Sequence, residues 1–239
     1  MAPPLVQARE WMQQGTLLFT ERPGLDDRAL AEPSALPGWS RKHVLAHLAA
    51  NADALGNLIR WAATGQPSPM YASPAEREAG IEQGSRLPAG ELAEWLRRSA
   101  AELEGAMMRL TELQWQAPVV TAQGRTVPAV EVPWMRSREV WVHAVDLAAG
   151  TSFADLPGGF VAALCDDVIR KRSAADAAVA RAAIALTATD TGRCWELPGE
   201  GDPLRVAGPQ ADICAYLTGR AHGLTVAGGG ALPALPAWL

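Results

Sequence analysis

The stretch WMRSREVWVHAVDL, residues 134–147, is the most informative segment of this 239-residue chain. Pro133 precedes it and Gly150 follows it, so we expect a helix in which Pro133 either starts the regular part or kinks it. Glu139 and His143 lie four residues apart, which places their side chains on one face of that helix. A carboxylate and an imidazole at this spacing can reach one metal ion, although the same spacing is common on solvated helix faces.

A second pair of histidines lies in LPGWSRKHVLAHLAANADALGNLIRWAATG, residues 36–65. Ser40 is a good N-cap, apolar residues recur at helical intervals, and Gly65 ends the pattern, so this segment is predicted to be a long helix. His43 and His47 are again four residues apart. His47 has apolar neighbours deep in the helix, whereas His43 lies in the first turn beside two basic residues. We therefore favour His47 as a ligand and place His43 at the rim of the site or behind a ligand.

Three of the four histidines thus lie on two helices that can face each other in a bundle. In that case His47, Glu139 and His143 can meet at one metal ion, leaving a fourth position open as in catalytic zinc sites. Asp146 lies three residues beyond His143 and either orients that imidazole or is a carboxylate of the helix surface. The alternative is structural: His43 and His47 are partly buried and hydrogen-bonded, and Glu139 pairs with a neighbouring arginine.

The rest of the first 150 residues is also helical in pattern. Helical periodicity marks residues 6–25, and Pro23-Gly24 should end that helix. A short helix is expected to start at Ser73-Pro74, and a longer one covers residues 88–115. Residues 117–127 are expected to be a loop. Four long helical segments in residues 1–150 predict a four-helix bundle, because that arrangement buries their apolar faces.

The pattern changes after Gly150. Residues 160–179 and 209–220 are expected to be helical, residues 182–190, 193–199 and 204–208 to be short strands, and residues 228–239 to be an extended tail. The predicted fold class is therefore α+β, with a helical bundle at residues 1–150 and a small α/β domain at residues 151–239.

Composition excludes several classes of function. Hydrophobic residues make up 49% and charged residues 20% of the chain, which is typical of a globular protein. The net charge of -5, without a basic stripe, indicates no nucleic-acid partner. No apolar run approaches the ~20 residues of a membrane span, and the N-terminus lacks a signal-peptide pattern, so we expect no membrane partner and a cytoplasmic location. Cys165, Cys194 and Cys214 form no CxxC pair and are interpreted as reduced thiols, mostly in the core.

Arginines are the side chains best suited to gripping carboxylates with two hydrogen bonds. Arg77, Arg125, Arg138 and Arg220 fall in loops or helices near the predicted site and are candidates for that reason alone. The alternative for each is a solvated surface charge.

Several segments of the chain resemble the mycothiol-dependent maleylpyruvate isomerases, a family of DinB-like zinc proteins. They are residues 37–55, 68–77, 121–129, 134–147, YLTGR at 216–220 and the closing Trp238-Leu239. The resemblance implies a DinB-like four-helix bundle followed by a small α/β domain, with zinc ligands at His47, Glu139 and His143. It also implies active-site arginines at Arg77 and Arg220. Pro133 departs from the family pattern at a position where we expect a non-proline helix residue, and residues 151–205 match least well.

The resemblance also implies a reaction, the conversion of maleylpyruvate to fumarylpyruvate in gentisate degradation. The thiol of mycothiol adds to the cis double bond, the resulting single bond rotates, and expulsion of the thiol restores a trans double bond. Zn²⁺ would keep the thiol deprotonated, and Arg77 and Arg220 would hold carboxylates of the dicarboxylate substrate or of the cofactor. Arg220 could do so only if the C-terminal domain closes over the bundle. The alternatives are a mycothiol S-transferase acting on another electrophile, and a non-catalytic zinc- or ligand-binding protein.

Overall fold

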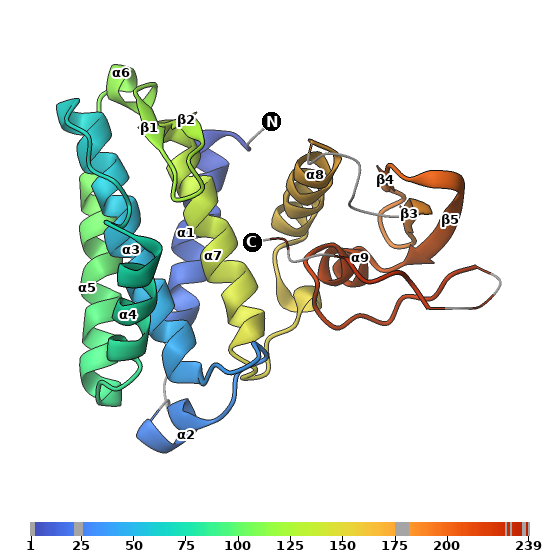
Figure 1. Ribbon diagram of the computed structural model, residues 1–239, viewed down its shortest axis with the longest axis horizontal. Coiled ribbons are helices and arrows are strands. Elements are labelled where there is room, and N and C mark those ends of the chain that lie inside the picture. Colours follow the sequence, from blue (N-terminus) through green and yellow to red (C-terminus); the bar gives the residue numbers. More distant parts are fainter. Residues whose placement is uncertain are drawn as a thin grey trace. The chain divides into compact units, whose positions relative to one another are not determined.

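The computed structural model describes residues 3–21, 26–174, 182–227, 229, 231–235 and 238. The chain divides into two compact units, one containing Pro3–Thr151 and the other Ser152–Leu239. Helices dominate and a small sheet accompanies them, so the predicted α+β class is confirmed (Figure 1). The predicted helix end at Pro23-Gly24 lies outside the described residues, as do Leu239 and several other residues of the predicted extended tail.

Four long helices run alongside one another in the first unit (Figure 1). They are α1 (Leu5–Thr20), α3 (Arg41–Thr64), α5 (Ala89–Met108) and α7 (Val132–Asp146). Helix α3 packs against both α5 and α7, and α1 packs against α7 and α5. The apolar face predicted for residues 36–65 is fully buried, as shown by its members Val44, Leu48, Leu55 and Leu58. Burial of these faces is what fixes α3 and α7 side by side.

Pro133 is the second residue of α7 and therefore starts the helix rather than kinking it. A proline is tolerated there because a backbone N–H in the first turn has no partner within the helix. A 3₁₀ turn, η1 (Ala129–Glu131), leads into the helix. The helix ends at Asp146, a little before the predicted end at Gly150. The departure from the family pattern at Pro133 thus leaves the helix regular where Glu139 and His143 lie.

Two details of the first unit differ from the sequence prediction. Residues 88–115 are not one helix, because α5 ends at Met108 and a separate short helix, α6 (Glu112–Trp115), follows. Residues 117–127, expected to be a loop, contain β1 (Pro118–Val120), which pairs antiparallel with β2 (Thr126–Pro128). Val119 and Val127 face each other in this hairpin and are buried. Strands of three residues are too short to show a period-two pattern in the sequence.

Shorter helices of the first unit lie against α3. Helix α2 (Asp27–Ala31) precedes α3, and α4 (Pro74–Gly84) lies against α3. The predicted start of α4 is confirmed, since the Ser73 hydroxyl accepts a hydrogen bond from the Glu76 N–H at 3.1 Å. Helix α4 matters for function because it carries Arg77.

In its described residues, the second unit combines a three-stranded sheet with two α-helices. Its elements are η2 (Phe153–Asp155), α8 (Gly158–Ala174), β3 (Ala182–Ala188), β4 (Cys194–Leu197), β5 (Glu200–Gly208) and α9 (Gln210–Leu217). The strand order is β4-β3-β5, with β3 antiparallel to β4 and parallel to β5. The three predicted strands are thus confirmed, and the part of the predicted helix 160–179 beyond residue 174 lies outside the described residues. In the described part of the chain, no helix is both long enough and apolar enough to span a membrane.

Candidate metal centre

Helices α3 and α7 bring His47, Glu139 and His143 to a common point. One potential ligand atom from each side chain lies within 4.8 Å of the other two. Glu139 Oε2 lies between the imidazoles, 2.9 Å from His47 Nε2 and 3.3 Å from His143 Nε2. Two Nε2 atoms and one carboxylate oxygen therefore converge, which is the donor set of several catalytic zinc sites. The donors fit a divalent ion, and their role as metal ligands stays a prediction.

The three side chains are buried to different degrees. His47 is 4% exposed as a residue, whereas the His143 and Glu139 side chains keep 14% and 21% of their surface. The cluster is therefore mostly buried, and Glu139 and His143 keep some exposed surface. A partly open, partly buried ligand set is what a catalytic metal needs in order to admit a further ligand.

The electrostatics of the cluster follow from this burial. Burial would raise the pKa of Glu139, but hydrogen bonds with His143 and His47 hold that pKa well below its usual range. Burial lowers the pKa of His47, and the partial compensation by Glu139 does not reverse the effect. Burial would also lower the pKa of His143, yet hydrogen bonds to Asp146 and Glu139 raise it to about 9. At neutral pH the metal-free cluster thus holds a carboxylate, a neutral His47 and a protonated His143.

Asp146 orients His143. Its Oδ2 atom lies 2.9 Å from His143 Nδ1, and its side chain is completely buried. Asp146 is therefore not a carboxylate of the helix surface, which was the alternative interpretation. A carboxylate that accepts the Nδ1 hydrogen fixes the ring orientation and leaves Nε2 available to a metal.

His43 lies outside the cluster. Its Nδ1 accepts a hydrogen bond from the Ser40 N–H at 3.2 Å and lies 2.8 Å from the Ser40 hydroxyl oxygen. Its Nε2 lies 3.3 Å from Glu82 Oε2. His43 therefore takes part in the N-terminal capping of α3, one turn before His47. The geometry agrees with the preference for His47 that its apolar neighbours suggested.

Of the four candidate arginines, Arg77 lies beside the cluster. Its Nη2 is 3.4 Å from His47 Nδ1, and its guanidinium carbon lies 6.0 Å from the centre of the Tyr71 ring. Arg138 is buried against Trp134 instead, with 5.9 Å between guanidinium carbon and ring centre.

The other two candidates are placed elsewhere. Arg125 is exposed in the turn of the β1–β2 hairpin. Arg220 belongs to the second unit, where its Nη1 donates to the Thr218 carbonyl at 2.5 Å.

Two residues beside the cluster were missed in the sequence. Arg136 is 1% exposed, and its Nη1 donates to the Leu48 carbonyl at 2.7 Å and to Asn51 Oδ1 at 2.9 Å. Burial lowers its pKa to about 10. It ties α7 to α3 three residues before Glu139, but nothing in the sequence distinguishes it from a surface arginine. Trp39 is the second, with its ring centre 5.7 Å from that of His47.

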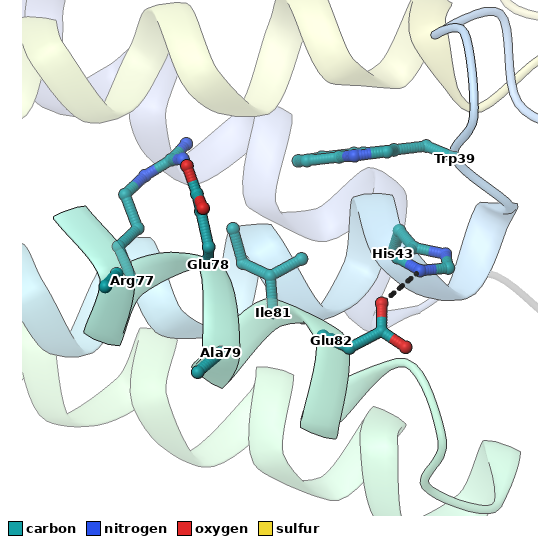
Figure 2. Close-up of a pocket in the computed structure, with 8 residues that line it drawn as sticks. Trp39, His43, Arg77, Glu78, Ala79, Ile81 and Glu82 are labelled. Atoms are coloured by element: carbon teal, nitrogen blue, oxygen red, sulfur yellow. Dashed lines mark hydrogen bonds and ion pairs between the residues drawn. The ribbon is translucent and has the colours of Figure 1, made fainter.

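A pocket of about 430 Å³ opens beside Arg77 (Figure 2). It lies between Trp39 and His43 on one side and helix α4 on the other. The residues that line it are Trp39, His43, Ala75, Arg77, Glu78, Ala79, Ile81 and Glu82. Its volume falls within the range of small-molecule sites in proteins.

Comparisons with known proteins agree with this geometry. Residues 12–148 match the family model of the mycothiol maleylpyruvate isomerase N-terminal domain. Two similar solved structures are a mycothiol-dependent maleylpyruvate isomerase and a histidine-to-alanine mutant of such an enzyme. They are 37% and 36% identical to this chain, each with a TM-score of 0.91 over 99% of this chain and 98% of theirs. A comparison with curated protein sequences gave no match.

Proposed function

The chain belongs to the mycothiol-dependent maleylpyruvate isomerase family, and from this premise we propose that it is a zinc-dependent cis-trans isomerase. Its reaction is the conversion of maleylpyruvate to fumarylpyruvate by reversible addition of the mycothiol thiolate. The observation that carries the proposal is the convergence of His47, Glu139 and His143 beside an open pocket. In this proposal, residues 1–150 are a DinB-like four-helix bundle that carries the metal, and residues 151–239 are a small α/β domain.

The three ligands leave room for the thiol. His47 Nε2, His143 Nε2 and one Glu139 oxygen would hold Zn²⁺, and the ion, when bound, would supply the positive charge that keeps a thiol deprotonated at neutral pH. Two neutral imidazoles and one carboxylate cancel only one of the two charges of the ion. The remaining positive charge suits both a thiolate and a dianionic substrate. Asp146 keeps His143 in the orientation that binding requires.

Arg77 and Arg220 are the proposed carboxylate-binding residues. Arg77 is placed for this role because its guanidinium lies beside His47, a ligand in the proposal. With zinc on His47 Nε2, Nδ1 carries the hydrogen and cannot accept one from Arg77, so the Arg77 donors become available to a carboxylate. Arg220 is proposed on the family resemblance of the segment YLTGR. Both arginines would position the substrate or the cofactor rather than exchange protons with them.

The cellular setting of the proposal is the cytoplasm. All three cysteines are free thiols, as expected in a reducing compartment, and two of them are buried. The proposed chemistry needs none of them, because the nucleophile belongs to the soluble cofactor.

Product analysis tests the proposal. We expect the zinc-loaded protein to convert maleylpyruvate to fumarylpyruvate when mycothiol is present, and to stop when zinc is removed by a chelator. Glutathione in place of mycothiol should support little reaction. Accumulation of a stable thiol adduct would indicate an S-transferase instead. Zinc binding without turnover of maleylpyruvate would indicate a binding protein.

A further inference from the structure

The pocket beside Arg77 combines an aromatic side chain with two carboxylates. Trp39 lies across the pocket from Ile81 of α4, as Figure 2 shows. Glu78 and Glu82 are four residues apart on α4 and both line the pocket, so their carboxylates belong to the same face of that helix. The pocket thus offers one flat apolar surface and hydrogen-bond acceptors along the opposite wall.

The two carboxylates differ in their partners. Glu82 is held by Arg86 at 2.7 Å and by His43 at 3.3 Å. Glu78 is exposed, and within the described residues it makes neither a hydrogen bond nor an ion pair. The Glu78 oxygens are therefore free to accept hydrogen bonds from a ligand without breaking an existing contact.

The pocket adjoins the proposed metal centre. Arg77 lines the pocket and also reaches to 3.4 Å from His47 Nδ1. The ring of Trp39 lies 5.7 Å from that of His47 and 6.1 Å from that of His43, centre to centre. The pocket thus shares Arg77 and Trp39 with the surroundings of His47, which is one of the proposed ligands.

We propose that this pocket binds the polyhydroxylated part of the thiol cofactor. This inference rests on the proposed function, because it takes mycothiol, a cysteine thiol carried on an amino sugar and a cyclitol, as the cofactor. The indole of Trp39 packs against the apolar C–H face of such a ring, and Glu78 and Glu82 accept hydrogen bonds from its hydroxyl groups.

The same charges keep the other reactant away from their part of the pocket. Maleylpyruvate is a dianion, and two carboxylates on one wall repel it. The neutral polyol therefore fits the part of the pocket between Trp39 and the two carboxylates, whereas the dicarboxylate stays at the Arg77 end, beside His47. The two carboxylates thus contribute to specificity, because they bind the hydroxyl groups of the cofactor and repel the dicarboxylate substrate.

Calorimetric titration of the zinc-loaded enzyme tests this assignment with two probes. The probes are mycothiol and the same amino sugar–cyclitol pseudodisaccharide without its cysteine. We expect Glu78→Ala to weaken binding of both probes about 10-fold, which is the effect of one charge-assisted hydrogen bond. Trp39→Leu should weaken both at least as much. Zinc content should stay unchanged in Glu78→Ala, because Glu78 is not one of the proposed metal ligands.

Glu91→Ala is the matched control, since it removes an exposed carboxylate of α5 that lies outside the pocket. It should bind both probes like the wild type. Wild-type affinity for both probes in Glu78→Ala and Trp39→Leu would overturn the pocket assignment, even if the enzyme isomerises maleylpyruvate with mycothiol. Conversely, pocket-dependent binding of the pseudodisaccharide without isomerisation would contradict the proposed function and retain the pocket assignment. No binding of either probe to the wild type would overturn both.

Discussion

His143 carries the proton that a metal ion has to displace. Asp146 at one ring nitrogen and Glu139 at the other both favour the charged imidazole, and together they raise its pKa to about 9. In the proposed site, Asp146 would orient the His143 ring and Glu139 would bind the same metal ion as His143. The residue contacts therefore prepare the site for a cation whether that cation is a proton or zinc.

As pH rises, we expect the stability of the metal-free protein to fall and its affinity for zinc to increase. The pKa of His143 is about 9 in the folded protein, whereas an unperturbed histidine has a pKa of 6.5. Protonated His143 stabilises the folded, metal-free protein, and this contribution is fully present below pH 6.5. It is lost as pH rises through about 9, which lowers the free energy of unfolding by on the order of 3 kcal/mol. Apparent zinc affinity should rise over the same interval, because zinc competes with that proton. Chemical denaturation and metal titration between pH 6 and 9 check this; pH-independent zinc affinity would contradict it.

Replacement of Asp146 by Asn should weaken the metal site without removing a ligand. The neutral amide no longer stabilises a charged His143 or enforces its orientation, so zinc affinity should fall about 10- to 100-fold. Competition with a chromophoric chelator measures the loss. An unchanged zinc affinity in Asp146→Asn would show that the contact of Asp146 with His143 is only structural.

At the residue scale, the local sequence environment indicated where the histidine side chains lie, whereas their roles as ligands stay predictions. His47 was preferred over His43 because its neighbours are apolar, and the structure places His47, not His43, beside Glu139. Arg136 was missed because its burial depends on the α3–α7 contact, which no residue pattern within α7 reveals. The pocket wall formed by α4 could not be predicted for the same reason.

At the scale of elements, close packing of α1 on α7 sets the position of the ligand-bearing helix. A Cβ at Gly15 of α1 would lie 2.5 Å from Val140 Cγ2 and 3.0 Å from Trp141 Nε1. The Trp141 indole also donates to the Trp11 carbonyl at 2.8 Å. The absence of a side chain at Gly15 thus lets the two helices approach next to Glu139.

Gly15→Ala and Gly56→Ala should change stability in opposite directions. Alanine is the better helix former, so Gly56→Ala in α3, where a Cβ meets nothing within 4 Å, should stabilise the protein by about 0.5–1 kcal/mol. Gly15→Ala instead forces Val140 and Trp141 to move, which should destabilise it by about 1–3 kcal/mol. Urea denaturation of both variants tests the contrast. Equal stabilisation by both would mean that α1 and α7 are not in close contact.

The elements themselves were predictable in proportion to their length. The long helices showed clear periodicity, and the capping signals Ser73 and Gly65 located the start of α4 and the end of α3. The prediction was wrong at two places, since it contained neither the break between α5 and α6 nor the β1–β2 hairpin. Elements of three or four residues are stabilised by contacts with the rest of the fold, which the local sequence does not show.

At the scale of the molecule, the residues of the proposed site are divided between the two units. All three proposed ligands lie in the unit containing Pro3–Thr151, whereas Arg220 lies in the unit containing Ser152–Leu239. The proposal therefore needs both units for turnover but only the first for metal binding. The sequence suggested this division through the change of pattern after Gly150, whereas the role of Arg220 came only from the family resemblance.

Replacement of Arg220 separates these two requirements. We expect Arg220→Ala to retain wild-type zinc content but to lose turnover of maleylpyruvate about 100-fold, because a charged hydrogen bond to a substrate carboxylate is missing. Arg205→Ala, at an exposed arginine of β5, is the control and should keep full activity. Elemental analysis and single-turnover kinetics provide the two readouts. Full activity of Arg220→Ala would remove Arg220 from the proposed site.

Zinc-edge X-ray absorption of the loaded protein, with and without mycothiol, tests the central claim most directly. Without the thiol we expect nitrogen and oxygen neighbours only, among them two imidazoles, as His47, Glu139 and His143 require. Addition of mycothiol should introduce a single sulfur neighbour at about 2.3 Å. A zinc ion bound by protein sulfur, or an environment that mycothiol leaves unchanged, would contradict the account.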